Sequence, residues 1–196
     1  REVGVNKVFF PSTASLYGTN PTPWREDMTP MPQDPYSFQK LSLEYACKLY
    51  SKSYGLNTFI YRFFQVFGEY QREDTALAAF LKYKREGEPI TLTETTAQST
   101  FRSGQRDFIY AGDIANAIIK GFEDDTMKDG EVYNMASGTV HTMEEVAQAI
   151  GGEVMWVPKR EYEQERHEAD LTKLHGKISK EDYMNVDVIE WLKHYV

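Results

Sequence analysis

The stretch DPYSFQKLSLEYACKLYSKSYG, Asp34 to Gly55, decides how the middle of the chain folds and carries its main chemical signal. Its early proline, helical spacing of apolar residues and final glycine predict one helix from about Pro35 to Tyr54. Tyr36 and Lys40 stand four residues apart, so their side chains share one face of that helix. An ammonium near a phenol favours the phenolate, which is a general base. The alternative is a chance pair on a solvated helix face, since Y-x-x-x-K alone is a weak motif.

The same helix carries an apolar stripe. Leu41, Tyr45 and Leu49 recur at helical spacing, and Ala46 and Tyr50 lie on the adjoining line. Such a stripe is typical of a helix that packs one face against other structure.

Two strand-like segments flank the helix. Lys7 to Pro11 is apolar and aromatic, and Asn57 to Gly68 shows little alternation, as in a parallel sheet covered on both faces. Between the first strand and the helix, Ser12 to Pro35 reads as a long proline-rich loop, and loops of that length are commonly functional. A hydroxyl side chain at the end of a strand stands where an α/β sheet presents ligand contacts.

The rest of the chain continues the alternation of strands and helices. The expected strands are EPITLTET, RDFIY, Glu131 to Ala136 and EVMWVP; the expected helices are Thr75 to Arg85, one capped by Asp113, one capped by Thr142, and two short ones after Asp170. This order predicts an α/β protein with a mostly parallel sheet.

Composition excludes several classes of protein. The 196 residues are 41% hydrophobic and 27% charged, which is ordinary for a globular protein, and the net charge of −8 disfavours a nucleic-acid binder. No apolar run is long enough to span a membrane, and one cysteine, Cys47, indicates a reducing, cytoplasmic setting. His167 and His175 lie among acidic residues, but their spacing matches no zinc motif, so we expect a solvated charged face and no metal.

Five motifs occur in an order that resembles a known family. VFFPSTASLYG, PYSFQK, YRFFQVFGEYQ, RDFIYAGDIANAI and VYNMASG follow one another as in the extended short-chain dehydrogenase/reductase family. Within it the chain looks most like the NAD-dependent sugar-nucleotide epimerases and dehydratases, such as UDP-glucose 4-epimerase. The resemblance runs from about Lys7 to Lys173.

The resemblance implies a catalytic group and a cofactor. Tyr36 matches the catalytic tyrosine, Lys40 the lysine that favours its phenolate and holds the nicotinamide ribose, and Thr13 the residue that hydrogen-bonds the reacting hydroxyl. The implied activity is epimerisation of a nucleotide-linked sugar: the sugar is oxidised by NAD to a transient ketone, which turns and takes the hydride back on its other face.

The resemblance also implies substrate-binding residues. Arg106 matches an arginine that contacts the nucleotide diphosphate, although an ion pair with Asp107 is the alternative. Arg160 roughly matches a second phosphate-binding arginine. Gln65 stands where the family usually has an asparagine that helps to hold the sugar.

Two departures from the family pattern affect the interpretation. Ala14 and Ser15 replace the Asp-Glu pair that a dehydratase would carry, which counts against dehydration. No Gly-rich turn of the kind that receives the cofactor pyrophosphate follows any predicted strand. The chain therefore looks like the carboxy-terminal portion of such an enzyme, with a first segment, Arg1 to Asn6, that resembles the tail of a preceding helix.

We therefore expect the remaining part of a Rossmann-type sheet in residues 1–68 and mainly a smaller α/β substrate-binding region in residues 69–196, with residues 106–122 returning to the Rossmann sheet. The resemblance also implies a homodimer through the helix of residues 35–54. A nucleotide-sugar reductase, or a non-catalytic fragment that binds sugar nucleotides, stays open as an alternative, and the isolated chain could lack activity.

Overall fold

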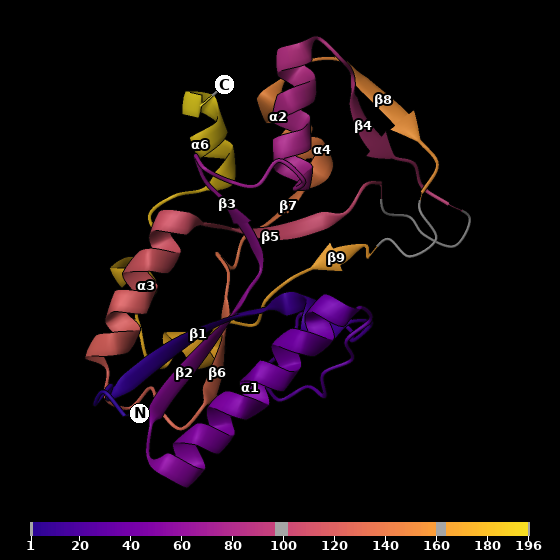
Figure 1. The fold of residues 1–196 in the computed structure, drawn as a ribbon. Coiled ribbons are helices and arrows are strands. Elements are labelled where there is room, and N and C mark those ends of the chain that lie inside the picture. The colour runs from indigo at the N-terminus through magenta and orange to yellow at the C-terminus, as the bar shows by residue number, and fades with distance from the viewer. Residues whose placement is uncertain (1, 97–101, 160–163, 196) are drawn as a thin grey trace.

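A computed structural model describes residues 2–96, 102–159 and 164–195 and shows the predicted α/β protein with parallel strand pairs (Figure 1). Its elements are β1 (Lys7–Thr13), η1 (Ala14–Tyr17), α1 (Pro35–Tyr54), β2 (Asn57–Phe63), β3 (Gln65–Phe67), α2 (Ala76–Glu86), β4 (Ile90–Thr93), β5 (Gln105–Tyr110), α3 (Ala111–Glu123), β6 (Glu131–Met135), β7 (Val140–Thr142), α4 (Met143–Ile150), β8 (Val154–Val157), β9 (Arg166–His167), α5 (Thr172–His175), η2 (Lys180–Asp182) and α6 (Val188–Tyr195). Within these described residues, no helix has the length and apolar character needed to cross a membrane.

The first sheet has the strand order β1-β2-β6, all parallel, with β1 at one edge. Because side chains alternate along β2, Thr58 and Arg62 contact α1 while Phe59 and Tyr61 contact α3. The sheet is thus covered on both faces, as the unbroken apolar pattern predicted. Gly121 allows the close approach of α3, since an added Cβ would lie 2.4 Å from the ring of Phe59.

The segment from Asn57 to Gly68 is not the single strand that its pattern predicted. It breaks at Phe64, whose N–H donates to the carbonyl of Met135, and continues as β3 in another sheet. There β5 pairs with β3, β7 and β9, and a further pair joins β4 and β8. Local apolar patterning could not show this change of sheet, because both halves carry apolar and aromatic side chains.

Two hydrophobic cores correspond to these sheets. The first surrounds β1-β2-β6 and includes Tyr17, Trp24, Tyr61, Tyr133 and Leu174. The second is enclosed by α2, α4 and α6 at the other end of the molecule (Figure 1). Within residues 106–122, β5 belongs to the second sheet, whereas α3 lies on the first.

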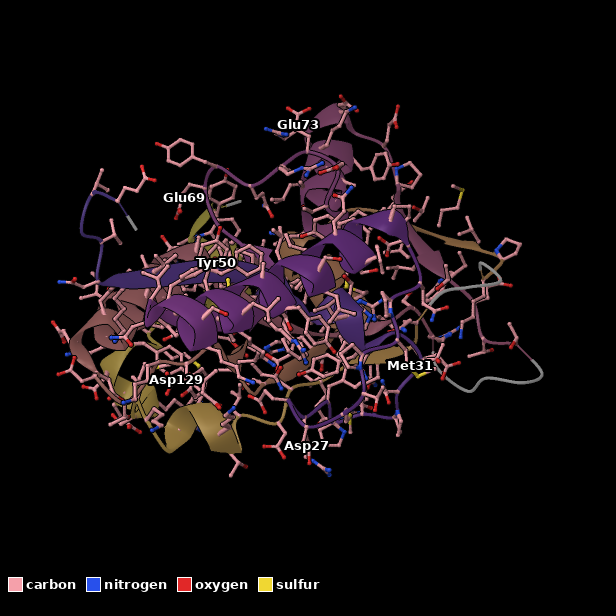
Figure 2. All side chains as sticks on the ribbon, turned by 60° about the horizontal axis from the view of Figure 1, so that its bottom comes forward. Asp27, Met31, Tyr50, Glu69, Glu73 and Asp129 are labelled. Carbon is pink, nitrogen blue, oxygen red and sulfur yellow. The ribbon has the colours of Figure 1, made fainter. Side chains whose placement is uncertain are left out.

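Helix α1 turns its apolar stripe outward, contrary to the usual meaning of such a stripe. Tyr45 is 58% and Leu49 60% exposed, and Tyr50 marks this outer side in Figure 2. The buried side chains of α1 are Ser37, Glu44 and Ser51. They are buried because each has a polar partner, which a hydropathy pattern does not reveal.

The expected helix cap at Asp113 is also wrong. The helix begins one turn earlier, with Tyr110 at the N-cap, and Asp113 lies in its first turn. The Asp113 carboxylate accepts hydrogen bonds from the backbone N–H groups of Asn185 and Val186, so it holds the segment that leads into α6. A partner more than seventy residues away cannot be inferred from the local sequence.

A buried ion pair fixes α1 to the first sheet. The guanidinium of Arg62 on β2 donates to both carboxylate oxygens of Glu44, at 3.0 and 2.7 Å, and the two side chains are 3% and 2% exposed. Ser12 on β1 donates to the same carboxylate. Three elements therefore meet at one charged group that has no access to water.

We expect Glu44→Gln to lower the free energy of unfolding by about 3 kcal/mol or more, because it leaves the Arg62 charge buried without its counter-ion. Urea denaturation measures the change. Asp74→Asn is the matched control, since it breaks the exposed pair with Arg72 and should leave stability nearly unchanged. Equal effects of the two variants would contradict a special role for the buried pair.

Candidate active site

Thr13 lies at the carboxyl end of β1, where the strand passes into η1. Its backbone is extended, and its hydroxyl accepts a hydrogen bond from the N–H of Ser15, which starts the short helix. The side chain is half-buried and belongs to the rim of the sheet where α/β proteins bind ligands.

Tyr36 and Lys40 lie in the first turns of α1. Asp34 begins the helix through a capping box with Ser37, and Pro35 occupies the first turn, so the position of Tyr36 is fixed by local sequence. The Tyr36 side chain is 55% exposed. It is presented at the surface rather than used in packing.

Lys40 connects this turn with the end of β1. Its ammonium donates to the carbonyl of Pro11 at 2.7 Å and lies 5.8 Å from the centroid of the Tyr36 ring. Because Pro11 precedes Thr13 by two residues, the structure brings the three predicted catalytic residues to one end of the sheet. Figure 1 shows this end, where the start of α1 approaches the end of β1.

Arg106 lies on β5 and does not pair with Asp107. Its guanidinium donates to the carbonyls of Gln105 and Glu165 and lies over Gly104, where an added Cβ would come within 2.2 Å of it. The Asp107 carboxylate is instead held by Ser137 and Gly138, and burial raises its pKa to about 6.

The other two predicted substrate residues are placed differently. Gln65 is half-buried at the start of β3, paired in register with Phe108, so it is near Arg106 along the neighbouring strand. Arg160 lies outside the residues that the structure describes.

The charged sequence around His167 and His175 predicted a solvated face; His175 is exposed, but His167 is half-buried. His167 pairs with Arg106 across β5 and β9, and its ring lies 5.0 Å from the Trp24 ring between centroids. Burial, helped by the nearby Arg106 charge, lowers the pKa of His167 to about 3. Among the described residues, no group of His, Cys, Asp or Glu side chains is arranged to hold a metal ion.

Residues that the sequence did not single out tie the long loop to this region. The Tyr17 hydroxyl donates a hydrogen bond to the side-chain oxygen of Asn134 at 2.6 Å, and the Tyr17 ring stacks on Trp24. The Arg62 guanidinium lies 4.8 Å from the centroid of the Tyr17 ring. Burial raises the pKa of Tyr17 to about 12. The only sequence signal for this cluster is the presence of two large aromatic residues, Tyr17 and Trp24, in and beside a proline-rich loop.

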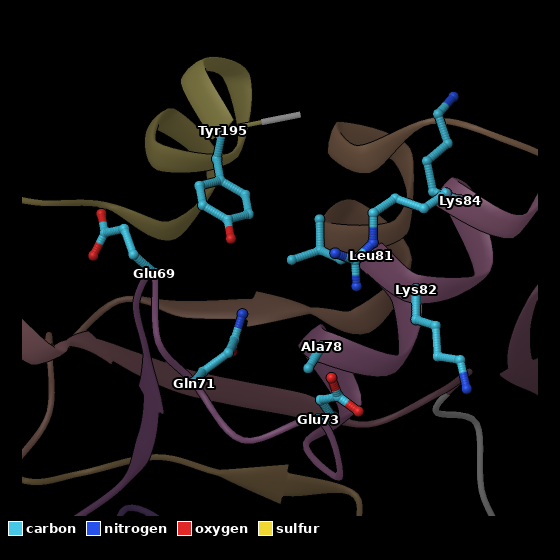
Figure 3. Close-up of a pocket in the computed structure, with 9 residues that line it drawn as sticks. Glu69, Gln71, Glu73, Ala78, Leu81, Lys82, Lys84 and Tyr195 are labelled. Atoms are coloured by element: carbon cyan, nitrogen blue, oxygen red, sulfur yellow. The ribbon is translucent and has the colours of Figure 1, made fainter.

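A separate cavity of about 310 Å³ lies between α2, α6 and the loop after β3 (Figure 3). Its walls include Glu69, Glu73, Lys82, Arg85 and Tyr195. None of the predicted site residues that the structure describes lines it, so it is distinct from the candidate active site.

The parallel sheet covered by helices, with a tyrosine and a lysine at the carboxyl end of its strand, defines a Rossmann-type protein of the short-chain dehydrogenase/reductase kind. The chain belongs to the NAD dependent epimerase/dehydratase family, whose model matches residues 1–136. The chain is 29% identical over 185 residues to a UDP-glucuronate 4-epimerase of Thermodesulfobacterium geofontis, which covers 92% of this chain and 53% of the relative.

Two further relatives agree with this assignment. A UDP-glucose 4-epimerase of Corynebacterium glutamicum is 30% identical over 165 residues, covering 76% of this chain and 48% of the relative. The solved UDP-glucose 4-epimerase of Thermotoga maritima, with UDP-glucose, superimposes with a TM-score of 0.81 at 26% identity, covering 98% of this chain and 62% of that one. The chain thus spans about half the length of the curated relatives it matches.

We expect His167 to contribute to acid unfolding. Its folded-state pKa of about 3 lies below the ordinary 6.5, so between these values the unfolded chain binds a proton that the folded chain does not. Stability is then lost as pH falls below 6.5, by up to about 1.4 kcal/mol per pH unit.

Urea titrations at several pH values should show a shallower loss for His167→Gln than for the parent chain. His194→Gln is the control, because His194 is exposed on α6. An unchanged slope for His167→Gln would show that the His167 imidazole is not held neutral by burial.

Proposed function

We propose that this chain supplies the catalytic residues and part of the substrate site of an NAD-dependent enzyme that epimerises a nucleotide-linked sugar. The observation that carries the proposal is the placement of Tyr36 and Lys40 beside the end of β1, near Thr13. The relatives named UDP-glucose and UDP-glucuronate 4-epimerase support a UDP-linked hexose or hexuronate, inverted at C4, as the substrate.

Each residue has a role that follows from its chemistry. Tyr36 takes the proton from the reacting sugar hydroxyl and returns it to the same oxygen after the sugar has turned. Lys40 places a positive charge beside the phenolate, and Thr13 donates a hydrogen bond to the sugar oxygen. We assign Arg106 and Arg160 to binding of the diphosphate, and Gln65 to binding of the sugar.

The residues present fit one end of the cofactor. In the part of the chain that the structure describes, Lys40 donates one hydrogen bond, to Pro11, so an ammonium with three N–H groups can also bind ribose hydroxyls. NAD, when bound, supplies the acceptance and return of the hydride. The pyrophosphate is assigned to residues outside these 196, because the sequence has no Gly-rich turn after a strand.

We assign residues 1–68 to the Rossmann portion and residues 69–196 mainly to substrate binding. The single cysteine supports a cytoplasmic protein.

The alternative functions differ in what they consume. A reductase would consume NADPH in proportion to product, and a fragment that only binds would convert no substrate. Ala14 and Ser15, which lack carboxylates, favour epimerisation over dehydration.

The test follows conversion of UDP-glucose and UDP-glucuronate to their 4-epimers, with NAD⁺, for this chain alone and with the first half of a family member added. We expect epimers without net oxidation, and Tyr36→Phe should lower kcat by about 100-fold or more, because it removes the proton acceptor. Tyr45→Phe, an exposed tyrosine on the same helix, is the control. Normal turnover by Tyr36→Phe would exclude the assigned mechanism, and net NADPH consumption would favour the reductase.

We also propose that the exposed face of α1 joins two copies of the chain. This one helix has a concentration of exposed apolar surface that is typical of an interface. The exposed side chains are Phe38, Leu43, Tyr45, Leu49 and Tyr50. The self-complementary contact of two such helices would form a twofold dimer.

Leu49→Glu should then convert a dimer to a monomer in analytical ultracentrifugation, because it places a charge in the centre of the interface. Ile119→Glu, an exposed apolar residue on α3, should leave the dimer intact. A parent chain that sediments as a monomer at high concentration would disprove the interface.

A further inference from the structure

The hydroxyl of Ser15 lies 3.0 Å from the hydroxyl of Thr13, and either oxygen can be the donor. Thr13 Oγ1 already accepts the backbone N–H of Ser15 at 3.2 Å. Both side chains are half-buried at the end of β1, and the next residues, Leu16 and Tyr17, are fully buried. The pair is therefore held by the backbone turn of η1 rather than by a mobile loop.

The number of hydrogen bonds that a hydroxyl can make gives this pair two states. A hydroxyl has one proton to donate and two lone pairs with which to accept. If Ser15 donates, Thr13 Oγ1 accepts two hydrogen bonds and its own proton must point away from Ser15. If Thr13 donates, its proton is used within the pair, and only a lone pair remains for a ligand.

Only the first state suits the reaction, and this step rests on the proposed function. When the sugar hydroxyl loses its proton to Tyr36 and becomes a carbonyl, its oxygen can accept but no longer donate. A Thr13 hydroxyl that presents a proton stabilises this oxygen, and one that presents a lone pair does not. The ligand therefore selects the state in which Ser15 donates.

We propose that Ser15 is a positioning residue that fixes the polarity of the Thr13 hydroxyl, so that Thr13 acts as a donor to the reacting oxygen. The relay runs from Ser15 Oγ to Thr13 Oγ1 to the sugar oxygen, and each hydroxyl that accepts a hydrogen bond becomes a better donor to the next. Ser15 acts through Thr13 and needs no contact with the sugar.

The test is a double-mutant cycle on the preparation that epimerises UDP-sugars. Ser15→Ala keeps the backbone N–H that caps η1 but removes the second donor, so we expect kcat to fall about tenfold, with KM changed less than about twofold. Ser15→Thr keeps a hydroxyl and should retain activity. In a Thr13→Ala background, Ser15→Ala should have no further effect. Thr19→Ala removes a nearby exposed hydroxyl and is the control.

The outcomes separate this inference from the function on which it rests. If Thr13→Ala slows epimerisation but Ser15→Ala does not, the role of Ser15 is wrong and the proposed function stands. If Ser15→Ala costs the same factor with and without Thr13, Ser15 acts independently and the relay is also wrong. If Thr13→Ala has no effect, the assigned role of Thr13 fails together with the relay. Should Ser15→Ala not fold, Ser15→Cys, with a weaker donor, should give an intermediate kcat.

Discussion

The ion pair between Glu44 and Arg62 is the constraint on which the candidate site depends. It joins α1 to β2, and through Ser12 to β1, without water as a competitor. Within the described residues, Arg62 Nη1 has no hydrogen-bond partner, and the guanidinium lies against the Tyr17 ring. Burying this pair costs desolvation free energy, and its geometric effect is to fix the third turn of α1 against β2 and the end of β1.

Much of this arrangement could be predicted from local sequence. Residues close in sequence determine where the helix of residues 35–54 starts and ends, and they set the spacing of Tyr36 and Lys40. The unbroken apolar segments predict the covered parallel sheet. These features depend on contacts close in the chain or on simple periodicity. They are the features that hydropathy and capping rules describe.

The rest depended on partners distant in the sequence. The break at Phe64, the buried charge of Glu44 and the capture of Asp113 by the segment before α6 are each satisfied by a residue from another element. The outward stripe of α1 has the same cause. Polar side chains with partners in other elements occupy the buried face of the helix, and apolar side chains are left exposed. The same reason applies to His167, because its neighbours in sequence are charged but its ring packs in space against Trp24.

The place of β1 at the edge of its sheet has a consequence for handling the chain. One side of Lys7–Thr13 pairs with β2, and among the residues that the structure describes no strand pairs with the other side of this aromatic strand. Such an edge is a template for strand addition by another molecule, which is how soluble sheets begin to aggregate. Pro11 has no N–H with which to pair an added strand, and its carbonyl accepts a hydrogen bond from Lys40, so the template is weakened at the end nearest the candidate site. The contact between Lys40 and Pro11, which belongs to the candidate active site, thereby also limits misassembly.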